Sequence, residues 1–345
     1  MGLAVLSGIL VVNAGSTSLK LSLVGEDESS TEVASLGDAP AGVQAVGHRI
    51  VHGGERFREP VIVDDAVCSE LETLTELAPL HNGPALAALE EARRRLPDIP
   101  HVAVFDTAFH ATMPEEATTY AVPLRWRSEW GIRRYGFHGL SVQWAAERVP
   151  SRRLVVCHLG GGCSVTAVLA GRSIDTTMGF SPLDGIPMAT RSGSIDPEIV
   201  LHLERTGRLD REGIENTLEH DSGLFGLSGL SGRVEELEAS RTPEALLALA
   251  VFSRRVAAAA SEMACAAGGL DALVFTGGVG EGSSAVRAGV CERLRFLGVQ
   301  LDAELNLRVQ SDVDIAAPGA TVRIAVIHAR EDVIAARGTR AAIAE

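Results

Sequence analysis

Residues 9–24 (ILVVNAGSTSLKLSLV) carry the pattern that decides the predicted fold. An apolar run predicts a strand, a turn of small residues follows, and the second half alternates apolar and polar residues, which predicts another strand. The same order recurs at residues 154–169 (LVVCHLGGGCSVTAVL), with a glycine-rich bend in place of the first turn. Two such hairpins about half a chain apart indicate an internal duplication in which each copy opens a domain.

Helical and strand patterns alternate around these hairpins. Helices are predicted at residues 66–77, 83–96, 141–148, 197–205 and 244–267, and further strands at 101–105, 272–275 and 322–327. Such alternation predicts an α/β fold. A short polar link near residue 150 sets the expected boundary between a first lobe of residues 1–150, completed by a C-terminal helix at 330–345, and a second lobe of residues 151–329.

Composition excludes several classes of protein. With 345 residues, 46% of them hydrophobic, the chain can bury two cores. The formal net charge of −14 makes nucleic acid or an anionic membrane surface a poor partner. Five cysteines without CxxC spacing argue against a disulfide framework and a zinc site, and favour a reducing cytoplasm. Charged residues interrupt the longest apolar stretch, 245–267, which therefore predicts a buried helix and not a membrane span.

Three Gly/Ser-rich turns follow predicted strands, at residues 13–18, 160–164 and 277–282. Glycine lets backbone N–H groups turn toward an oxygen anion, and Ser and Thr add hydroxyl donors, so these turns suit phosphate. Each alone is also what an ordinary tight turn at a strand end requires. None matches the P-loop or dinucleotide-binding pattern, and the three together favour a phosphate site divided between two lobes.

Charged side chains gather at other turns. Arg49 lies between two histidines beside paired glycines, where it can bind a carboxylate or phosphate bidentately or be a solvated surface residue. Asp106 follows a predicted strand, which suits either an active-site carboxylate or a helix cap. His138 follows two arginines at a turn, and Arg191 lies in a loop rich in Gly, Ser and Thr.

Taken together, these segments resemble the acetate kinase family in collinear order over most of the chain. The resemblance is carried by residues 12–20, 46–55, 78–82, 104–113, 135–141, 158–164, 175–197 and 275–281. That family belongs to the actin-like ATPase and sugar-kinase superfamily. The resemblance therefore implies duplicated actin-like (ribonuclease H-like) α/β domains, a nucleotide cleft between two lobes, and a homodimer formed through the second domain.

The resemblance also implies roles on the acceptor side. Arg49 corresponds to the ligand of the substrate carboxylate, and Asp106 to the active-site carboxylate. His138 and Arg191 correspond to groups that stabilise the transferring phosphoryl group. A small apolar pocket suited to a methyl or ethyl group corresponds to Val51, Leu80, Phe137 and Pro182.

On the donor side, Asn13 and Glu331 correspond to a Mg²⁺ site, with Mn²⁺ as an alternative metal, and Lys20 to a nucleotide-phosphate contact. The nucleotide loops correspond to His158, Leu159, Gly160, Gly161, Gly162, Ser231, Gly232, Arg233, Gly278, Val279, Gly280, Glu281 and Gly282.

The implied activity is reversible phosphoryl transfer from ATP to acetate, giving acetyl phosphate and ADP by direct in-line attack. Such a transfer needs fixed cations and donors around the equatorial oxygens, which Arg191, His138 and Mg²⁺ would supply. Asp106 can orient a cation, bind magnesium through water or position the attacking carboxylate, and these roles stay open. A propionate or butyrate kinase is one alternative, and a non-catalytic nucleotide-binding relative is another.

Several departures from the family fall on the donor side. Gly161 and Gly282 stand where the family carries Asn, and Gly232 stands in a shortened loop that lacks an Asp near the adenine. The Thr-Asn pair before Glu331 is replaced, and the chain is shorter than usual members. Three lost polar contacts at about 0.5–1.5 kcal/mol each would weaken nucleotide binding by about ten- to a thousandfold. Pyrophosphate or another nucleotide therefore stays open as the donor.

Overall fold

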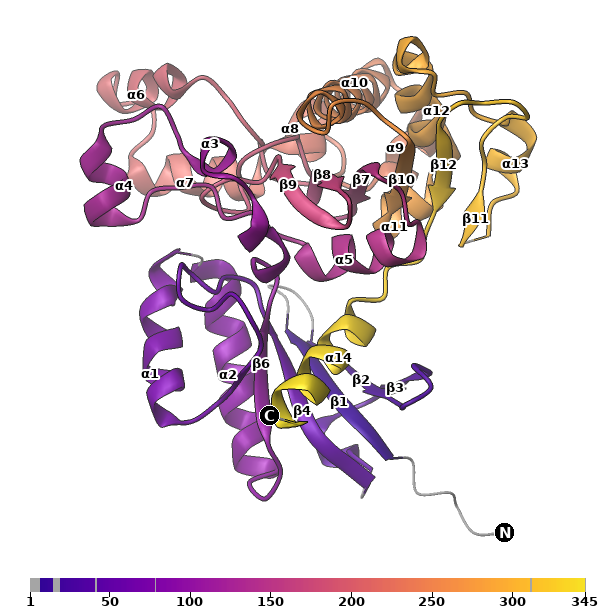
Figure 1. The fold of residues 1–345 in the computed structure, drawn as a ribbon. Coiled ribbons are helices and arrows are strands. Elements are labelled where there is room, and N and C mark those ends of the chain that lie inside the picture. Colours follow the sequence, from indigo (N-terminus) through magenta and orange to yellow (C-terminus); the bar gives the residue numbers. More distant parts are fainter. Residues whose placement is uncertain (1–6, 15–18, 41, 78, 311, 345) are drawn as a thin grey trace. The chain divides into compact units, whose positions relative to one another are not determined.

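The computed structural model describes residues 7–14, 19–40, 42–77, 79–310 and 312–344, without the side chains of residues 7, 76–77 and 79–81. The chain packs as two compact units (Figure 1). Unit 1 comprises Met1–Ala111, Phe137–Trp144 and Arg330–Glu345, and unit 2 comprises Thr112–Gly136 and Ala145–Ala329. The division expected from sequence places residues 112–136 and 145–150 in the first lobe, whereas packing groups them with unit 2.

Unit 1 is built on a six-stranded sheet with the order β3-β2-β1-β4-β6-β5. Its strands are β1 (Ser7–Ala14), β2 (Leu19–Val24), β3 (Ser30–Val33), β4 (Gly42–Ile50), β5 (Val61–Ile62) and β6 (His101–Phe105). Strands β1, β4 and β6 are parallel, and the other three pair antiparallel. The predicted hairpin is therefore confirmed as β1–β2.

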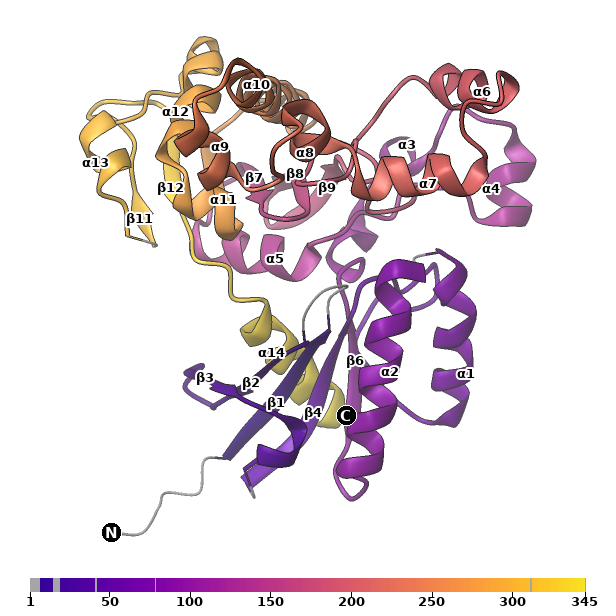
Figure 2. The same cartoon turned by 180° about the vertical axis from the view of Figure 1, so that it is seen from behind.

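Helices cover both faces of this sheet. Those of unit 1 are η1 (Leu36–Asp38), α1 (Asp65–Thr73), η2 (Leu74–Leu77), α2 (Pro79–Arg95), η3 (Ala108–Thr112) and α14 (Glu331–Ala344). Helices α2 and α14 lie on opposite faces (Figures 1 and 2). On the α2 face, Leu86 and Leu89 pack with Ile50 and Phe105. On the other face, a Cβ atom at Gly47 would lie 2.3 Å from Thr339 Oγ1, so glycine lets α14 lie directly on β4.

Unit 2 contains a second six-stranded sheet with the order β11-β12-β10-β7-β8-β9. Its strands are β7 (Arg153–Leu159), β8 (Cys163–Leu169), β9 (Arg172–Thr176), β10 (Ala272–Thr276), β11 (Val313–Asp314) and β12 (Arg323–Val326). Its helices are α3 (Glu115–Thr118), α4 (Leu124–Trp130), α6 (Pro197–Arg205), α7 (Arg211–His220), α8 (Gly223–Ser228), α9 (Val234–Ser240), α10 (Pro243–Ala266), α11 (Gly277–Gly282), α12 (Ser284–Arg293), η4 (Arg295–Leu297) and α13 (Ala303–Leu307). Helix α5 (Gly139–Arg148) begins in unit 1 and ends in unit 2.

The two sheets share one topology. Read from β9 to β11, the second sheet repeats the first strand by strand, with β7, β10 and β12 parallel in the places of β1, β4 and β6. The antiparallel neighbours correspond as well, including the edge strands β5 and β11. The predicted duplicated α/β fold is confirmed.

Two local predictions have different outcomes. Residues 277–282, expected as a glycine-rich turn, form the short helix α11, which starts at Gly277 with a φ of 77°. The apolar stretch 245–267 is α10, whose inner face is buried, as predicted. Across the described part of the chain, no helix is long and apolar enough to cross a membrane.

Among the buried histidines of unit 1, hydrogen bonds define the tautomers of His48, His101 and His110. His101 Nε2 lies 3.0 Å from the carbonyl of Leu96 and must donate to it, so His101 Nδ1 accepts from His48 Nε2 at 2.9 Å. His110 Nε2 likewise donates to the carbonyl of Phe137 at 2.9 Å. Burial lowers the pKa of His48 from 6.5 to about 3, assisted by His101, and burial lowers the pKa of His110 to about 4.

These histidines predict a loss of stability in mild acid. Between the folded pKa and 6.5, the unfolded chain binds protons that the folded chain excludes, so the free energy of unfolding falls as pH drops below 6.5. The expected slope is about 1.4 kcal/mol per pH unit for each histidine. Urea unfolding between about pH 7.5 and about pH 5 measures it, and His48→Gln, which can still donate to His101, should remove one histidine's share. An equal free energy of unfolding across this pH range would contradict the lowered pKa values of His48 and His110.

Candidate active site

A charged cluster lies at the carboxyl ends of two neighbouring parallel strands of unit 1. Arg49 is next to the end of β4 and Asp106 directly follows β6. Arg49 Nε donates to Asp106 Oδ1 at 2.9 Å and Nη2 to Oδ2 at 2.5 Å, which is a bidentate pair. With side chains 16% and 1% exposed, the pair is largely buried, and Arg49 is not a solvated surface residue.

The main chain after Phe137 closes around Asp106. Gly139 N donates to the Asp106 carbonyl at 3.0 Å, and a Cβ atom on Gly139 would lie 2.1 Å from that oxygen, so only glycine fits. Burial raises the pKa of Asp106 above its usual value, while Arg49 and the backbone amide of His138 oppose the rise. Asp106 is therefore held from both its side chain and its backbone.

His138, one of the predicted phosphoryl-stabilising residues, has a φ of 60°, in the left-handed region that non-glycine residues seldom adopt. The contacts of Gly139 and of the His138 amide with Asp106 maintain this conformation. Strained backbone of this kind is concentrated at functional sites. The structure thus brings His138 and Asp106 together in unit 1.

Asn13 and Glu331 complete the charged cluster. Asn13 Oδ1 accepts from Arg49 Nη1 at 3.0 Å, and Glu331 Oε2 lies 3.4 Å from both Arg49 Nη1 and Asn13 Nδ2. Lys20 is exposed and lies opposite Asn13 in the β1–β2 register. The described residues contain no group of three His, Cys, Asp or Glu arranged for a metal. Because Mg²⁺ is held by one or two carboxylates together with phosphate oxygens and water, the oxygen donors of Asn13 and Glu331 fit it.

Two predicted pocket residues, Val51 and Phe137, are buried in unit 1. The ring of Phe137 meets that of His52 edge-on, with centroids 5.4 Å apart. Asn82 binds the His52 backbone at both N and O, each at 3.1 Å, which sets the loop that carries Val51. Leu80 lies in α2, and its side chain is outside the described part of the structure.

In unit 2, the predicted nucleotide loops lie side by side. Thr276 at the end of β10 pairs with His158 near the end of β7, so the segments that follow these strands are neighbours. A Cβ atom on Gly277 would lie 3.3 Å from His158 Nε2, and one on Gly160 would lie 3.9 Å from Gly278 N. Leu159 is fully buried, and Gly161 and Gly162 complete the bend. Helix α11 contains Gly278, Val279, Gly280, Glu281 and Gly282.

The loop that carries Arg191 lies against these segments. Ala189 N donates to the carbonyl of Gly161 at 3.3 Å, and a Cβ atom on Gly232 would lie 2.6 Å from the Ala189 carbonyl oxygen. The third predicted nucleotide segment, which contains Ser231, Gly232 and Arg233, therefore lies beside the same loop. Ser231 is buried, whereas Arg233 is 70% exposed and paired with Glu235.

Arg191 itself forms an ion pair that the sequence did not predict. Its Nε lies 3.1 Å from Glu219 Oε2 on α7, and both side chains are about one-sixth exposed. The whole of α6, the loops on either side of it and most of α7 separate the two residues, so no local pattern links them. The pair fixes the position of the Arg191 guanidinium in unit 2.

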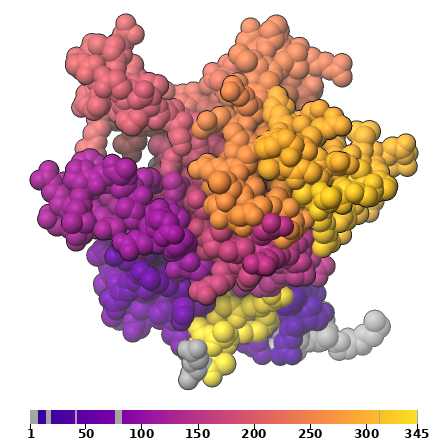
Figure 3. Space-filling view, turned by 45° about the horizontal axis from the view of Figure 1, so that its top comes forward, coloured from indigo at the N-terminus to yellow at the C-terminus, as the bar shows by residue number. Residues whose placement is uncertain are grey.

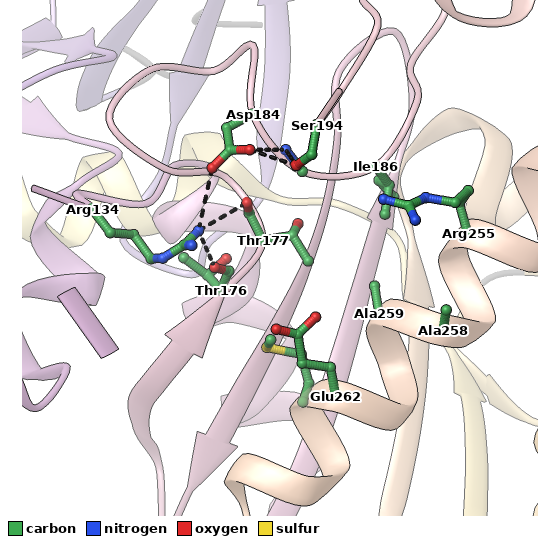
Figure 4. Close-up of a pocket in the computed structure, with 12 residues that line it drawn as sticks. Arg134, Thr176, Thr177, Asp184, Ile186, Ser194, Arg255, Ala258, Ala259 and Glu262 are labelled. Carbon is green, nitrogen blue, oxygen red and sulfur yellow. Dashed lines mark hydrogen bonds and ion pairs between the residues drawn. The ribbon is translucent and has the colours of Figure 1, made fainter. Parts of the chain in front are cut away.

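A pocket of about 190 Å³ in unit 2 is lined by Arg134 and Asp184, which contact each other and the protein backbone (Figure 4). Arg134 Nη1 donates to the carbonyls of Thr176 and Thr177 at 2.9 and 3.0 Å, and lies 3.7 Å from Asp184 Oδ2. Arg134 thus ties the end of β9 to the loop that contains the buried Pro182. The remaining lining residues come mainly from α10 and residues 185–194.

The comparisons with known proteins identify the family of the chain. Residues 32–337 match the Acetokinase family. The chain is 46% identical over 301 residues to acetate kinase of Trichormus variabilis, covering 84% of this chain and 74% of that protein. It is 41% identical over 351 residues to acetate kinase of Rippkaea orientalis, covering 96% and 87%.

Solved structures agree as well. A propionate kinase from Francisella tularensis superposes with a TM-score of 0.89 at 32% identity, covering 96% of this chain and 98% of that one. Porphyromonas gingivalis acetate kinase gives 0.86 at 30% identity, covering 98% and 100%. Fold and relatives together define a phosphotransferase of the actin-like ATPase fold. The chain belongs to the acetokinase family.

Proposed function

We propose that the protein transfers a phosphoryl group reversibly between ATP and the carboxylate of acetate. The observation that supports this most directly is the Arg49–Asp106 pair at the strand ends of unit 1. The buried apolar residue Val51 lies two positions after Arg49, and the buried Phe137 precedes His138, whose backbone amide contacts Asp106. A fixed guanidinium together with apolar side chains suits a short carboxylic acid. Acetate kinases among the relatives carry the same activity in their names.

Arg49 has donors left for the acid. Three of its five N–H groups go to Asp106 and Asn13, which hold the guanidinium in one orientation. The remaining donors can bind the incoming carboxylate and present one of its oxygens for in-line attack on the γ-phosphorus. In this proposal Asp106 acts by orienting Arg49, which is one of the roles left open by sequence.

The donor side supplies charge for the transferring group. Arg191 exchanges Glu219 for equatorial phosphoryl oxygens, and His138 donates to the same group. Asn13 and Glu331 would hold Mg²⁺, which neutralises charge on the β- and γ-phosphates. The glycine-rich segments of unit 2 offer backbone N–H groups to the nucleotide phosphates.

Trapping acyl phosphate as a hydroxamate tests this function. Acetate, propionate and butyrate are each paired with ATP and with pyrophosphate, with Mg²⁺ and after its removal by chelation. We expect acetate with ATP and Mg²⁺ to give the highest kcat/KM, and Arg191→Ala to lower kcat by about a thousandfold because it removes a cation from the transition state.

Arg205→Ala is the matched control for that variant. Arg205 lies on α6 with its side chain 62% exposed and pairs with Glu198, so its loss should leave kcat unchanged. Near-normal kcat in Arg191→Ala would remove this residue from the mechanism. Absence of hydroxamate with every acid and donor would favour a non-catalytic nucleotide-binding protein, and a higher kcat/KM for propionate or butyrate would identify that acid as the substrate.

The glycines on the donor side differ in the space around them. A Cβ atom at Gly161 or Gly282 would meet nothing within 4 Å, and neither residue has a positive φ. At Gly232, by contrast, a Cβ atom would meet the Ala189 carbonyl oxygen at 2.6 Å. Glycine is therefore required by packing only at position 232.

Gly161→Asn should improve the binding of ATP. The amide adds a hydrogen bond to a phosphate-binding segment, so KM for ATP should fall by about two- to tenfold while KM for acetate stays the same. Gly232→Asn is the control of opposite sign, because its clash with Ala189 should raise KM for ATP. If KM for ATP is unchanged in Gly161→Asn and the variant is folded, this segment does not contact the nucleotide.

We further propose a homodimer formed through unit 2. Helix α6 has no buried residue, yet it carries Ile199 and Leu201, which are 48% and 52% exposed, next to the exposed Ile195. The segment coloured for residues near 200 projects from unit 2 in Figure 3. Burying each of these side chains contributes about 1.5–3 kcal/mol. We therefore propose that the apolar face of α6 packs against a second copy of the chain.

Light scattering coupled to gel filtration tests the dimer. Wild-type protein should elute at twice the chain mass of 36.3 kDa, and Leu201→Glu should elute as a monomer because it places a charge in the apolar contact. Leu307→Glu, at an equally apolar residue 74% exposed on α13, should remain dimeric. A monomeric wild type would refute the assignment.

A further inference from the structure

Arg287 is a fully buried cation in unit 2. It lies on α12 with 1% of the residue exposed, and its hydrogen bonds go to uncharged oxygens. Nη1 donates to the carbonyls of Gly280 and Glu281 at 2.9 and 2.7 Å, in the last turn of α11. Carbonyls at a helix C-terminus lack intrahelical partners and favour a nearby cation. Burying a cation costs free energy unless its donors are satisfied. The burial of Arg287 therefore indicates that it serves to hold the C-terminal carbonyls of α11.

Asn306 connects Arg287 to one further helix, α13. Arg287 Nε donates to Asn306 Oδ1 at 2.7 Å and Nη2 to its carbonyl at 2.9 Å. Asn306, which is itself 3% exposed, donates from Nδ2 to the carbonyl of Ser284 at 2.9 Å. Helices α11, α12 and α13 are therefore joined through one guanidinium.

At the other side of α11, the Glu281 carboxylate holds the segment where the chain leaves unit 2. Glu281 Oε1 accepts from Ala329 N at 3.1 Å, and Oε2 lies 2.7 Å from His328 Nδ1. Residues 327–329 form this exit segment, since Ala329 is the last residue of unit 2. Glu331, the proposed metal ligand, follows two residues later.

We infer that Glu281 and Arg287 are positioning residues that couple α11 to the exit segment. Because of this coupling, a nucleoside triphosphate bound at α11 also orders residues 327–329. The inference rests on the proposed function, which places the nucleotide at residues 278–282. It assigns the Glu281 carboxylate to the exit segment and not to the nucleotide. The glycines of α11 then bind phosphate through their backbone, while the two charged side chains act on either side of them.

Hydrogen–deuterium exchange tests both parts of the inference. Without ligand, Glu281→Gln should accelerate exchange in a peptide spanning residues 327–331 by about tenfold, because the amide binds Ala329 N and His328 more weakly than the carboxylate does. With Mg²⁺ and ADP or ATP added, wild type should slow exchange both at residues 277–282 and at 327–331. Glu281→Gln should retain the first protection and lose the second.

Asp314→Asn is the matched control, since it removes an ion pair of similar length, 2.9 Å to Arg323 Nε, on the neighbouring strands β11 and β12. It should leave both peptides and the activity unchanged. Arg287→Lys should raise KM for ATP by about tenfold with KM for acetate unchanged, because a lysine cannot reach all four acceptors.

Two outcomes separate this inference from the proposed function. The inference is overturned, and the nucleotide site stands, if nucleotide slows exchange at residues 277–282 of the wild type but leaves exchange at residues 327–331 unchanged. It is likewise overturned if residues 327–331 of Glu281→Gln exchange at the wild-type rate. If neither nucleotide protects residues 277–282, the proposed nucleotide site fails and the coupling fails with it. The ligand-free comparison of Glu281→Gln with Asp314→Asn then decides whether Glu281 holds the exit segment.

Discussion

The buried pair of Arg49 and Asp106 is the interaction on which the site of unit 1 depends. It joins the carboxyl ends of β4 and β6 and orients the guanidinium toward Asn13 and Glu331. Taking two charges out of water costs several kcal/mol per ion, and well-packed apolar residues often give equal or greater stability. Removing one partner would cost about 3–5 kcal/mol, since it leaves the other charge buried and unpaired. Stability alone therefore does not explain the pair, in keeping with the carboxylate-binding role proposed for Arg49.

The same sheet topology serves two kinds of chemistry. In unit 1, the ends of the three parallel strands carry side-chain groups: Asn13 on β1, Arg49 on β4 and Asp106 after β6. In unit 2, the corresponding strands β7 and β10 lead into glycine-rich segments that present backbone. One copy of the duplicated fold thus carries polar and charged side chains at its strand ends, and the other carries glycine-rich segments there. This difference accords with the rule that function lies in sites carried by folds.

Local patterns predicted much of this. Apolar runs separated by turns of small residues identified both hairpins, and a long apolar stretch interrupted by charges identified α10, because these signals lie within a few residues of one another. The resemblance to a family indicated which charged residues belong to the site. Because residues 277–282 are rich in glycine, the sequence predicted a turn, which was wrong. Hydrogen bonds from Arg287 stabilise a helix there although the intrinsic helix propensity of these residues is poor.

The sequence by itself determined the duplicated α/β architecture, the strand ends where polar residues would emerge, and the candidate residues of the acceptor site. Only the tertiary structure decided how the guanidinium groups are used. Arg49 pairs with Asp106, Arg191 with Glu219, and Arg134 and Arg287 with backbone carbonyls. The physical reason is that a strand or helix is selected by neighbours along the chain, whereas the partners of an arginine are selected by distance and burial in space, which bring together residues far apart in sequence.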